Sequence, residues 1–459
     1  MNVNPITRLD YPDPDVIRVE DTYYMVSTTM HFMPGCEILQ SFDLVHWEHA
    51  TYVYETLDHT DAQQLKSGQN IYGQGMWAAS LRYHEGRFYI CFVANDTRKT
   101  YLYTSEKIDG PWKKQLIEGF YHDGSLLFDE DGRNYIVYGN DEIWITELNE
   151  DLTAPKKDGL HRLLVSDHKN PELGYEGSHI QKINGYYYIF LVHSLRDRWM
   201  RTEACFYSDS LEGEFTGGDV LCDDRGYCGQ GVAQGGIVDT PDGKWYAMLF
   251  QDSGAVGRIP ILLPVTWKDH FPVFGQNGHV PEEIEVHSTR PGYIYQPLVG
   301  SDDFCNGLLP RWQFNHDPDP RYYHLDALQG TYTITTREVC TELTQAVNTL
   351  TQRMSYPSCA AEVTVDASAL KEGDVAGLCA LQGCYAAVGI TKHHGKYEVL
   401  MLDKKEDGIL DMTEGTVVES HQMDFRLEAD FCNMKDEARC YYRVNKGDWL
   451  PIGTVHKLY

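Results

Sequence analysis

The 459-residue sequence predicts an all-β protein, in which a five-bladed β-propeller is followed by a C-terminal β-sandwich. Aromatic residues make up 12% of the chain, and many lie in alternating runs such as TYYMVST and RFYICFV, which are typical of strands. A turn-and-strand signature recurs five times at intervals of about 45 to 65 residues, as expected for radially repeated sheets. Long helical periodicity is nearly absent. A chain of this length is also expected to form more than one domain.

The repeated signature reads Gly-x-aromatic-Tyr or a close variant, and it predicts the central turn of each blade. Its five copies are Asp21-Thr22-Tyr23-Tyr24, Gly86-Arg87-Phe88-Tyr89, Gly132-Arg133-Asn134-Tyr135, Gly185-Tyr186-Tyr187-Tyr188 and Gly243-Lys244-Trp245-Tyr246. An apolar anchor precedes each copy: Ile17, Leu81, Leu127, Ile180 and Val238. The predicted blades span residues 12–56, 76–116, 121–165, 175–221 and 231–274.

The remaining sequence changes character after the fifth blade. Residues 274–304 are rich in Gly, Pro and charge, and we expect a linker that wraps back over the propeller. From about residue 302 the period is replaced by short alternating strands such as CAAEVTVDA and KYEVLML, typical of a β-sandwich. The predicted domains are residues 1–298 and 299–459.

The composition excludes several classes of protein. A formal charge of −29 argues against nucleic acid or an anionic membrane surface as partner, because either requires a cationic footprint. The N-terminus has no signal-peptide pattern and no stretch of about 18 apolar residues occurs, so we expect a soluble, cytoplasmic protein. The twelve cysteines form no C-x-x-C pair and are expected to be small buried hydrophobes.

The residues four positions before the anchors are the candidate site. They are Asp13, Trp77, Asp123, Glu176 and Gln234. Residues in one phase of a propeller repeat occupy equivalent places around the axis, so three carboxylates, an indole and an amide should meet at one point. Hydrolysis of a glycosidic bond needs one carboxylic acid to protonate the leaving oxygen and one carboxylate to activate water or attack the sugar. A third carboxylate nearby would raise the pKa of the acid.

Each acid also has a structural alternative. Asp13 is flanked by prolines and could be a turn former, with Asp15 as its competitor. The counterparts of Asp15 are the small residues Ala79, Ser125, Ser178 and Gly236, which favours Asp13 as the inward group. Asp123 could be a structural turn acid, whereas Glu176 runs directly into an apolar strand, where Glu is disfavoured unless it has a role.

Other residues are candidates for binding the substrate. Trp77 is by default a core indole, but its phase with the acids favours stacking on a sugar. Arg258 is either a surface charge or a fork of donors for sugar hydroxyls. His31, His179 and Gln234 are ambiguous between packing and pocket lining.

Several motifs together resemble glycoside hydrolase family 43, near its β-xylosidases and α-L-arabinofuranosidases. They are YPDPDVIRV, GMWA, HDGSLLFDEDG, YEGSHI and QGGIVDTPDGKWYA. The resemblance covers nearly the whole chain, because the region after Ser301 is similar to the C-terminal concanavalin-like β-sandwich of such enzymes. It implies that Asp13 is the general base, that Glu176 is the general acid, and that Asp123 tunes and orients Glu176. It also implies inversion at the anomeric carbon.

The resemblance further implies which residues bind the sugar and what else is bound. Trp77 and Arg258 match positions in the sugar subsite, and His31 and Phe32 lie in a loop that would form its wall. No cofactor is required. Many relatives have a His in place of Gln234, facing a water or a calcium ion. With an amide at this position, the presence of a structural calcium ion in the channel is an open question. The oligomeric state, with a homo-oligomer as one alternative, is also open.

We therefore predict an inverting exo-glycosidase that releases terminal β-D-xylosyl or α-L-arabinofuranosyl units from small, xylan-derived oligosaccharides. A retaining fructan or sucrose hydrolase is one alternative, but it requires W-M-N-D-P-N and R-D-P elements that the sequence lacks. A carbohydrate-binding propeller without turnover is the other alternative, and the presence of all three acids argues against it.

Overall fold

Five four-stranded antiparallel sheets follow one another along the first 274 residues of the protein. The structure is a computed structural model that describes residues 3–413 and 415–459. In chain order the sheets comprise β1 (Asp15–Val19), β2 (Thr22–Val26), β4 (Gly35–Ser41) and β5 (Glu48–Tyr54); β6 (Met76–His84), β7 (Arg87–Ala94), β8 (Lys99–Ser105) and β9 (Lys113–Ile117); β10 (Ser125–Phe128), β11 (Asn134–Asn140), β12 (Glu142–Leu148) and β13 (His161–Ser166); β14 (Glu176–Ile183), β15 (Tyr186–Ser194), β16 (Arg201–Ser208) and β17 (Thr216–Leu221); β18 (Ala233–Asp239), β19 (Trp245–Asp252), β20 (Arg258–Lys268) and β21 (Phe271–Phe274).

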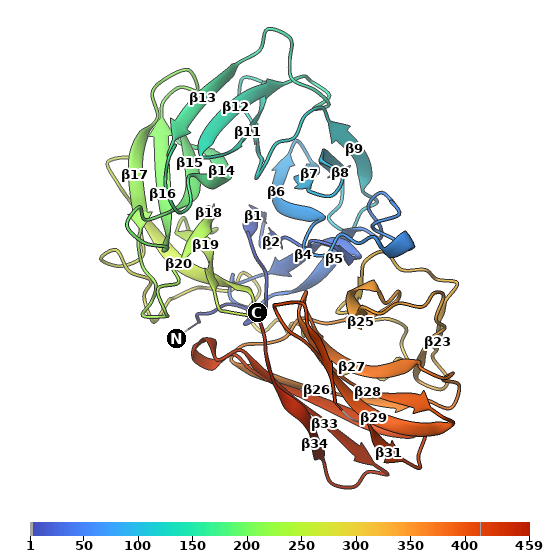
Figure 1. The fold of residues 1–459 in the computed structure, drawn as a ribbon. Helices are drawn as coiled ribbons and strands as arrows, with labels where there is room; N and C mark the ends of the chain where they lie inside the picture. The colour runs from blue at the N-terminus through green and yellow to red at the C-terminus, as the bar shows by residue number, and fades with distance from the viewer. Residues whose placement is uncertain (1–2, 414) are drawn as a thin grey trace. The chain divides into compact units, whose positions relative to one another are not determined.

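The five sheets form a closed propeller. The first strand of each sheet contacts the first strand of the next, from β1 through β6, β10, β14 and β18 back to β1. Figure 1 shows these strands around a common centre, with the later strands of each sheet further out. The predicted five-bladed propeller is therefore confirmed, and the predicted blades match the observed sheets closely.

The N-terminal segment closes the ring. The backbone N–H of Ile6 donates to Pro260 O at 2.8 Å. The side-chain amide of Asn4 donates to Leu262 O at 2.7 Å and accepts from Leu262 N at 2.8 Å. Residues 4–11 thus join the fifth sheet to the first, so that the axial side chains of both are held in place.

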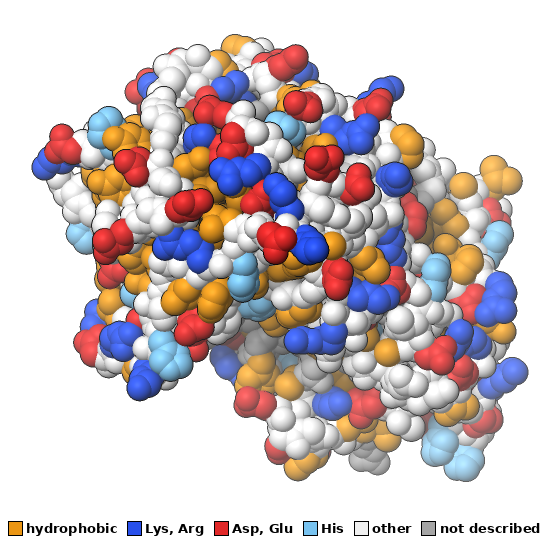
Figure 2. Space-filling view, turned by 90° about the horizontal axis from the view of Figure 1, so that it is seen from above, with side chains coloured by type: hydrophobic (Ala, Val, Ile, Leu, Met, Phe, Trp, Pro, Cys, Tyr) orange, Lys and Arg blue, Asp and Glu red, His pale blue; other side chains and the backbone are white. Residues whose placement is uncertain are grey.

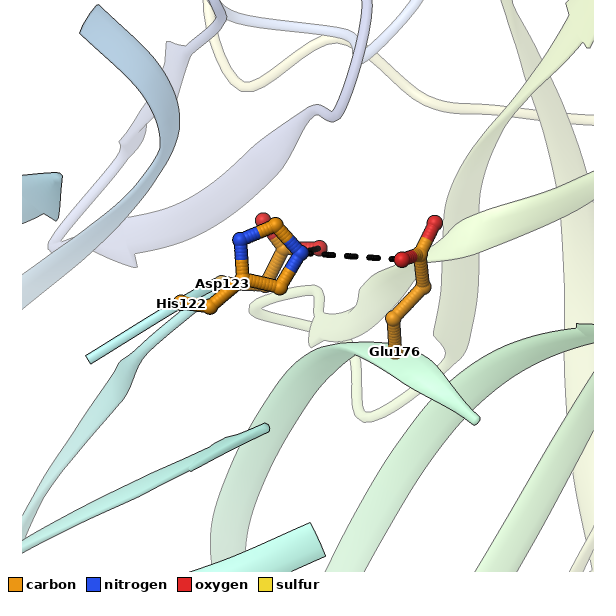
Figure 3. Close-up of side chains that lie close together, drawn as sticks. All are labelled: His122, Asp123 and Glu176. Carbon is orange, nitrogen blue, oxygen red and sulfur yellow. Dashed lines mark ion pairs between the residues drawn. The ribbon is translucent and has the colours of Figure 1, made fainter. Parts of the chain in front are cut away.

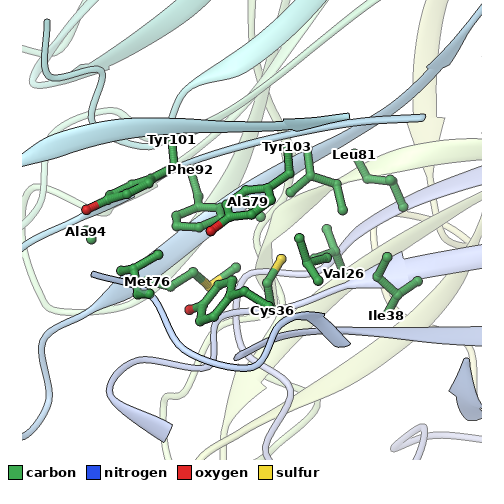
Figure 4. Packing of buried hydrophobic residues seen from close by; sticks show 14 of the residues in the cluster. Val26, Cys36, Ile38, Met76, Ala79, Leu81, Phe92, Ala94, Tyr101 and Tyr103 are labelled. Carbon is green, nitrogen blue, oxygen red and sulfur yellow. The ribbon is translucent and has the colours of Figure 1, made fainter. Parts of the chain in front are cut away.

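Apolar side chains fill the space between neighbouring sheets. Between the first and second sheets Phe92 is 1% exposed, and its ring lies 5.3 Å from Tyr101 and 5.8 Å from Tyr103 (Figure 4). Val26 and Ile38 of the first sheet belong to the same cluster. Burying one such side chain contributes about 1.5–3 kcal/mol, so the packing between sheets keeps the axis rigid.

Part of the chain after the propeller returns to the first blade. Strand β3 (Phe32–Met33) pairs with β22 (Gln313–Asn315), which pairs with β25 (Leu350–Thr351). The strands β23 (Tyr323–Asp326) and β24 (Thr331–Ile334) form a separate hairpin. Three short 3-10 helices complete the described chain: η1 (Lys66–Gly68), η2 (Leu343–Gln345) and η3 (Cys432–Met434).

A β-sandwich forms the C-terminal part, as predicted. One sheet comprises β26 (Ser358–Asp366), β32 (Gln422–Asp430), β33 (Glu437–Val444) and β34 (Leu450–Lys457). The other comprises β27 (Val375–Leu381), β28 (Tyr385–His393), β29 (Lys396–Lys404) and β30 (Leu410–Met412), with β31 (Thr416–Val418) also paired to β29. Alternate residues of β32, including Met423, Phe425 and Leu427, are buried.

Two compact units are defined by contacts and interleave along the chain. The first comprises the chain up to Asp252 with Arg258–Val339 and Val347–Arg353, and the second comprises Ser253–Gly257, Cys340–Ala346 and Met354–Tyr459. The single boundary between residues 298 and 299 stays a prediction.

The surface and the cysteines bear on the composition-based expectations. All twelve cysteines are free, but only Cys36, Cys91, Cys205 and Cys440 are buried. The expectation of buried cysteines is wrong for five exposed ones, because these lie outside the strands of the sheets: Cys222, Cys228, Cys305, Cys340 and Cys432.

Acidic and basic side chains are interspersed over the face seen in Figure 2. Within the described residues, no helix has the length and apolarity needed to cross a membrane.

Candidate active site

One left-handed residue recurs at the entrance of each inner strand. These residues and their φ angles are Asp13 (53°), Ala78 (39°), Asp123 (47°), Gly177 (66°) and Gln234 (61°). In the second, fourth and fifth sheets the strand register shifts at this point, as in a β-bulge. Bulges re-aim side chains near active sites. All five residues line one cavity on the axis.

The observed phase differs by one residue from the predicted phase in two sheets. Ala78 and Gly177 occupy the axial positions, where the apolar-anchor rule places Trp77 and Glu176. The rule fails because the true counterparts of Ile17 in these sheets are the polar residues Arg82 and Gln181. Trp77 therefore does not line the axial cavity.

Arg82 ties four sheets together below the axial residues. Its guanidinium donates to Asp15 Oδ2 at 2.8 Å, to Ser125 Oγ at 2.6 Å and to the carbonyls of Leu126 and Ile180 at 2.9 and 3.2 Å. Although burial raises the pKa of Asp15, Arg82 and His179 outweigh it and lower the pKa. Asp15 is thus a structural carboxylate, which supports the choice of Asp13 as the inward acid.

The Asp13 side of the site carries a permanent positive charge. Asp13 Oδ1 accepts from Arg258 Nη1 at 3.0 Å, and Asp13 Oδ2 accepts from Thr28 Oγ1 at 2.6 Å. Arg258 Nε also lies 3.3 Å from Asp252 Oδ1, and Asp252 forms a second ion pair with Arg201. Burial and the charge of Arg258 lower the pKa of Arg201 to about 10, so both guanidinium groups remain charged at neutral pH.

The Glu176 side of the site carries a titratable positive charge instead. Asp123 Oδ2 accepts from the backbone N–H of Gly177 at 3.1 Å. His122 Nε2 lies 3.6 Å from Asp123 Oδ2 and 3.6 Å from Glu176 Oε2. Figure 3 shows the imidazole beside Asp123 and directed at Glu176. Glu176 Oε2 also accepts from Asn140 Nδ2 at 2.7 Å.

The surroundings shift the pKa of two of these groups. Burial raises the pKa of Asp123 to about 7; the charge of His122 opposes this shift, and the charges of Glu176 and Asp13 reinforce it. Burial lowers the pKa of His122, but its interactions with Glu176, Asp123 and Asp13 outweigh burial and raise it. Asp123 therefore exchanges its proton near neutral pH, next to the candidate acid Glu176.

Two of the candidate binding residues, Trp77 and Phe32, are connected through Gly73 and His31, and we call this pair the rim. The indole N–H of Trp77 donates to Gly73 O at 3.2 Å, and Gly73 N donates to His31 Nδ1 at 3.1 Å. The His31 ring lies 4.3 Å from the ring of Phe32. Burial and His316 hold the pKa of His31 well below its usual value, so it is neutral, and at 1% exposure it supports the rim from behind.

The cavity on the axis has a volume of about 10 Å³, the space of one water molecule. The oxygen atoms around the cavity that could bind a cation belong to Asp13, Asp123, the Gln234 amide and the hydroxyl of Ser178. The Ser178 hydroxyl has no hydrogen-bond partner among the described residues. Calcium takes six to eight oxygen ligands. Asp15, the next carboxylate, is already paired with Arg82 and His179, so these donors fit a water better than a calcium ion.

Sequence reasoning missed His122, Asn140, Thr28, Asp252 and Arg201. A signal for His122 exists: it precedes the left-handed Asp123 by one residue, as Trp77 precedes Ala78 and Glu176 precedes Gly177. In the observed phase, His122, Trp77 and Glu176 therefore occupy equivalent positions. The others could not be found from the repeat, because no shared phase links them to their partners: Thr28 is 15 residues from Asp13, Asn140 is 36 residues from Glu176, and Arg201 is 51 residues from Asp252.

The fold and the set of facing carboxylates define a glycoside hydrolase. Residues 3–272 match the model of Glycosyl hydrolases family 43, and residues 301–458 match the Beta xylosidase C-terminal Concanavalin A-like domain. The chain belongs to glycosyl hydrolase family 43. The resemblance found in the sequence is thus confirmed, and neither alternative class is favoured.

Three similar proteins illustrate the relationship. A β-xylosidase of Formosa agariphila is 27% identical over 463 residues, covering 87% of this chain and 76% of that protein. A solved bifunctional GH43-CE protein of Bacteroides eggerthii is 41% identical with a TM-score of 0.92, covering 99% of this chain, which spans only 59% of that chain. A GH43 enzyme engineered to display both endo-xylanase and exo-arabinofuranosidase activity is 27% identical with a TM-score of 0.85, covering 99% and 93% of the two chains.

Proposed function

We propose that this enzyme releases terminal β-D-xylosyl or α-L-arabinofuranosyl units from small oligosaccharides with inversion at the anomeric carbon. The observation that carries the proposal is the meeting of Asp13, Asp123 and Glu176 around one axis, with different partners on the two sides. The similarity to a β-xylosidase and to an enzyme with exo-arabinofuranosidase activity supports the choice of sugars.

Asp13 is the general base of the proposed reaction. Arg258 and Thr28 each bind one of its oxygens, so the carboxylate is held in one orientation. It removes a proton from a water molecule, whose oxygen attacks the anomeric carbon from the face opposite the leaving group. Because the attacking atom is water oxygen, no covalent sugar–enzyme intermediate forms.

Glu176 is the general acid. Its side chain is 20% exposed, so it can reach a bound substrate, and it gives its proton to the glycosidic oxygen as the bond to the anomeric carbon breaks. Asp123, at 7% side-chain exposure, stays behind it and holds the backbone of Gly177, the residue that follows Glu176. Asp123 therefore orients Glu176, and the negative charges of the two carboxylates repel each other, which favours the protonated form.

The proposed sugar pocket lies between these acids and the rim. Trp77 provides an aromatic surface, and the guanidinium of Arg258 provides donors for sugar hydroxyls. Phe32 forms the wall, the buried His31 supports it from behind, and Gln234 closes the pocket at the axis. All chemical steps use groups of the protein itself, and we propose that the axial cavity holds water and that no cofactor takes part.

The test is the hydrolysis of xylobiose and of arabinosyl-xylo-oligosaccharides, followed by proton NMR of the first product. The expected result is release of a terminal sugar, with α-xylose formed first from a β-xyloside. First appearance of β-xylose would exclude inversion, and absence of turnover on both substrates and on their aryl glycosides would overturn the proposal.

A further inference from the structure

Among the residues that the structure describes, His122 is the one basic side chain within 4 Å of both Asp123 and Glu176, which we call the acid pair. Its Nε2 atom is equidistant, at 3.6 Å, from Asp123 Oδ2 and Glu176 Oε2 (Figure 3). The side chain is 24% exposed, so it remains in contact with solvent. Neither the repeat nor the assignment of acid and base gives this residue a role.

The backbone fixes the place of the imidazole. His122 O accepts from Gly139 N at 3.0 Å, on the neighbouring strand β11. The preceding residue, Tyr121, is 5% exposed and its N–H donates to Thr100 Oγ1 at 3.1 Å. With both ends of the peptide held, the backbone that carries the imidazole is fixed beside the carboxylates.

The charges around His122 are unbalanced without it. The groups that raise its pKa are Glu176, Asp123 and Asp13, all carboxylates. Of the fixed cations of the site, Arg258 binds Asp13, and Arg201 is paired with Asp252 and acts on Glu176 only through its charge. The imidazolium is therefore the cation in contact with both Asp123 and Glu176, and Asn140 adds only a neutral donor.

We propose that His122, as an imidazolium, is a positioning residue for the acid step, which stabilises the carboxylate that Glu176 becomes after giving its proton to the leaving oxygen. This inference rests on the proposed function. In the step the glycosidic C–O bond breaks, the proton passes from Glu176 to the departing oxygen, and Asp13 takes the proton of the attacking water. The negative charge then remaining on Glu176 lies beside His122.

A pH effect follows from the same geometry. The charge of His122 lowers the pKa of Asp123, which is nevertheless about 7. Removing the imidazolium therefore raises the pKa of Asp123 above that value. Asp123 beside Glu176 then keeps its proton to higher pH, so the alkaline limb of kcat/KM moves upward although the rate on its plateau falls.

The experiment compares His122→Gln with the wild-type enzyme on aryl glycosides of the sugar that the wild-type enzyme releases. Leaving groups range from 2,4-dinitrophenol, which needs little protonation, to phenol, which needs much. The expected result is a loss of about 10-fold or more in kcat on phenyl glycosides, little loss on dinitrophenyl glycosides, and an upward shift of the alkaline limb. His161→Gln, on the third blade outside the site, is the matched control and should behave as wild type.

Two outcomes would overturn the inference. An equal loss of kcat on every leaving group, without a shift of the pH profile, would indicate a merely structural role for His122. No loss of kcat on any substrate would indicate that His122 has no role in turnover. Measuring Glu176→Ala on the same series of leaving groups separates failure of the inference about His122 from failure of the proposed function. If Glu176→Ala depends strongly on the leaving group and His122→Gln does not, only the inference fails; if neither depends on it, the assignment of Glu176 as acid fails too.

Discussion

The two sides of the active site neutralise their carboxylates differently. Asp13 is bound by Arg258, a guanidinium that stays charged at every pH at which the protein is folded. Asp123 and Glu176 face His122, whose charge depends on pH, together with the neutral amide of Asn140. Asp13 must be ionised before it takes a proton from water, whereas Glu176 must be protonated before it gives its proton to the leaving oxygen, so a permanent cation suits the base and a titratable cation suits the acid.

The backbone also differs between the candidate base, Asp13, and the candidate acid, Glu176. Asp13 and Asp123 are themselves the left-handed residues of their strands, so their carboxylates point at the axis and are nearly buried. Glu176 stands one residue earlier, with Gly177 taking the left-handed position. Its longer side chain is therefore more exposed to solvent, at 20%, than those of Asp13 and Asp123, as expected for a group that meets the leaving group.

The largest expected effect is on turnover. Asp13→Ala and Glu176→Ala should each reduce kcat on unactivated oligosaccharides by roughly 10²- to 10⁴-fold. On 2,4-dinitrophenyl glycosides Glu176→Ala should recover much of its activity, because the leaving group needs no acid, whereas Asp13→Ala should not. Glu130→Ala, an exposed acid in a turn of the third blade, should retain wild-type rates. Equal behaviour of the two active-site variants on all substrates would contradict the division of roles.

The second effect is on stability. The folded-state pKa of Asp123, about 7, is above the ordinary value, so folding loses stability as pH rises from about 4 to 7. The loss is on the order of 1–4 kcal/mol. Asp123→Asn, which tolerates the left-handed backbone, should be inactive and have a Tm similar to wild type at pH 4 but higher at pH 8. Asp13→Asn should show no such gain, because it removes one of the two carboxylates that face Arg258; a similar gain in both variants would remove the contrast between the sides.

A smaller effect is expected from the permanent cation. Arg258→Gln should lower kcat/KM about 10- to 100-fold at neutral pH, since hydrogen bonds to charged groups contribute about 1.5–3 kcal/mol. Arg258→Lys should recover only part of this, because an ammonium cannot reach both Asp13 and Asp252 as a fork. Kinetics of the two variants, with the exposed Arg133→Gln as control, measure how much orientation adds to charge. Full activity in Arg258→Gln would exclude the role.

The smallest effect is expected for the neutral donor. Asn140→Ser removes the 2.7 Å hydrogen bond to Glu176 Oε2 and leaves His122 in place. A neutral hydrogen bond contributes about 0.5–1.5 kcal/mol, so kcat on poor leaving groups should fall about 2- to 10-fold. The steady-state rates of this variant and of His122→Gln rank the two partners of the acid. A larger loss in Asn140→Ser than in His122→Gln would reverse the ranking.

The sequence by itself determined the five blades, the sandwich and the three acids. Alternating apolar residues and turn signatures such as Gly86-Arg87-Phe88-Tyr89 act over a few neighbouring residues, so they are legible without contacts. Asp13, Asp123 and Glu176 stand out because each lies four residues before an apolar anchor, and their catalytic roles stay a prediction.

Only the tertiary structure decided the exact phase and the charges of the site. Arg82 and Gln181 stand where the repeat suggests an apolar anchor, because their side chains bind neighbouring sheets, and this moves the axial position by one residue. The contacts of Arg258 with Asp13 and of β22 with β3 join segments more than 240 residues apart. Which cation meets which carboxylate depends on how the sheets pack, and a pattern of neighbouring residues carries no information about contacts between segments so far apart in the sequence.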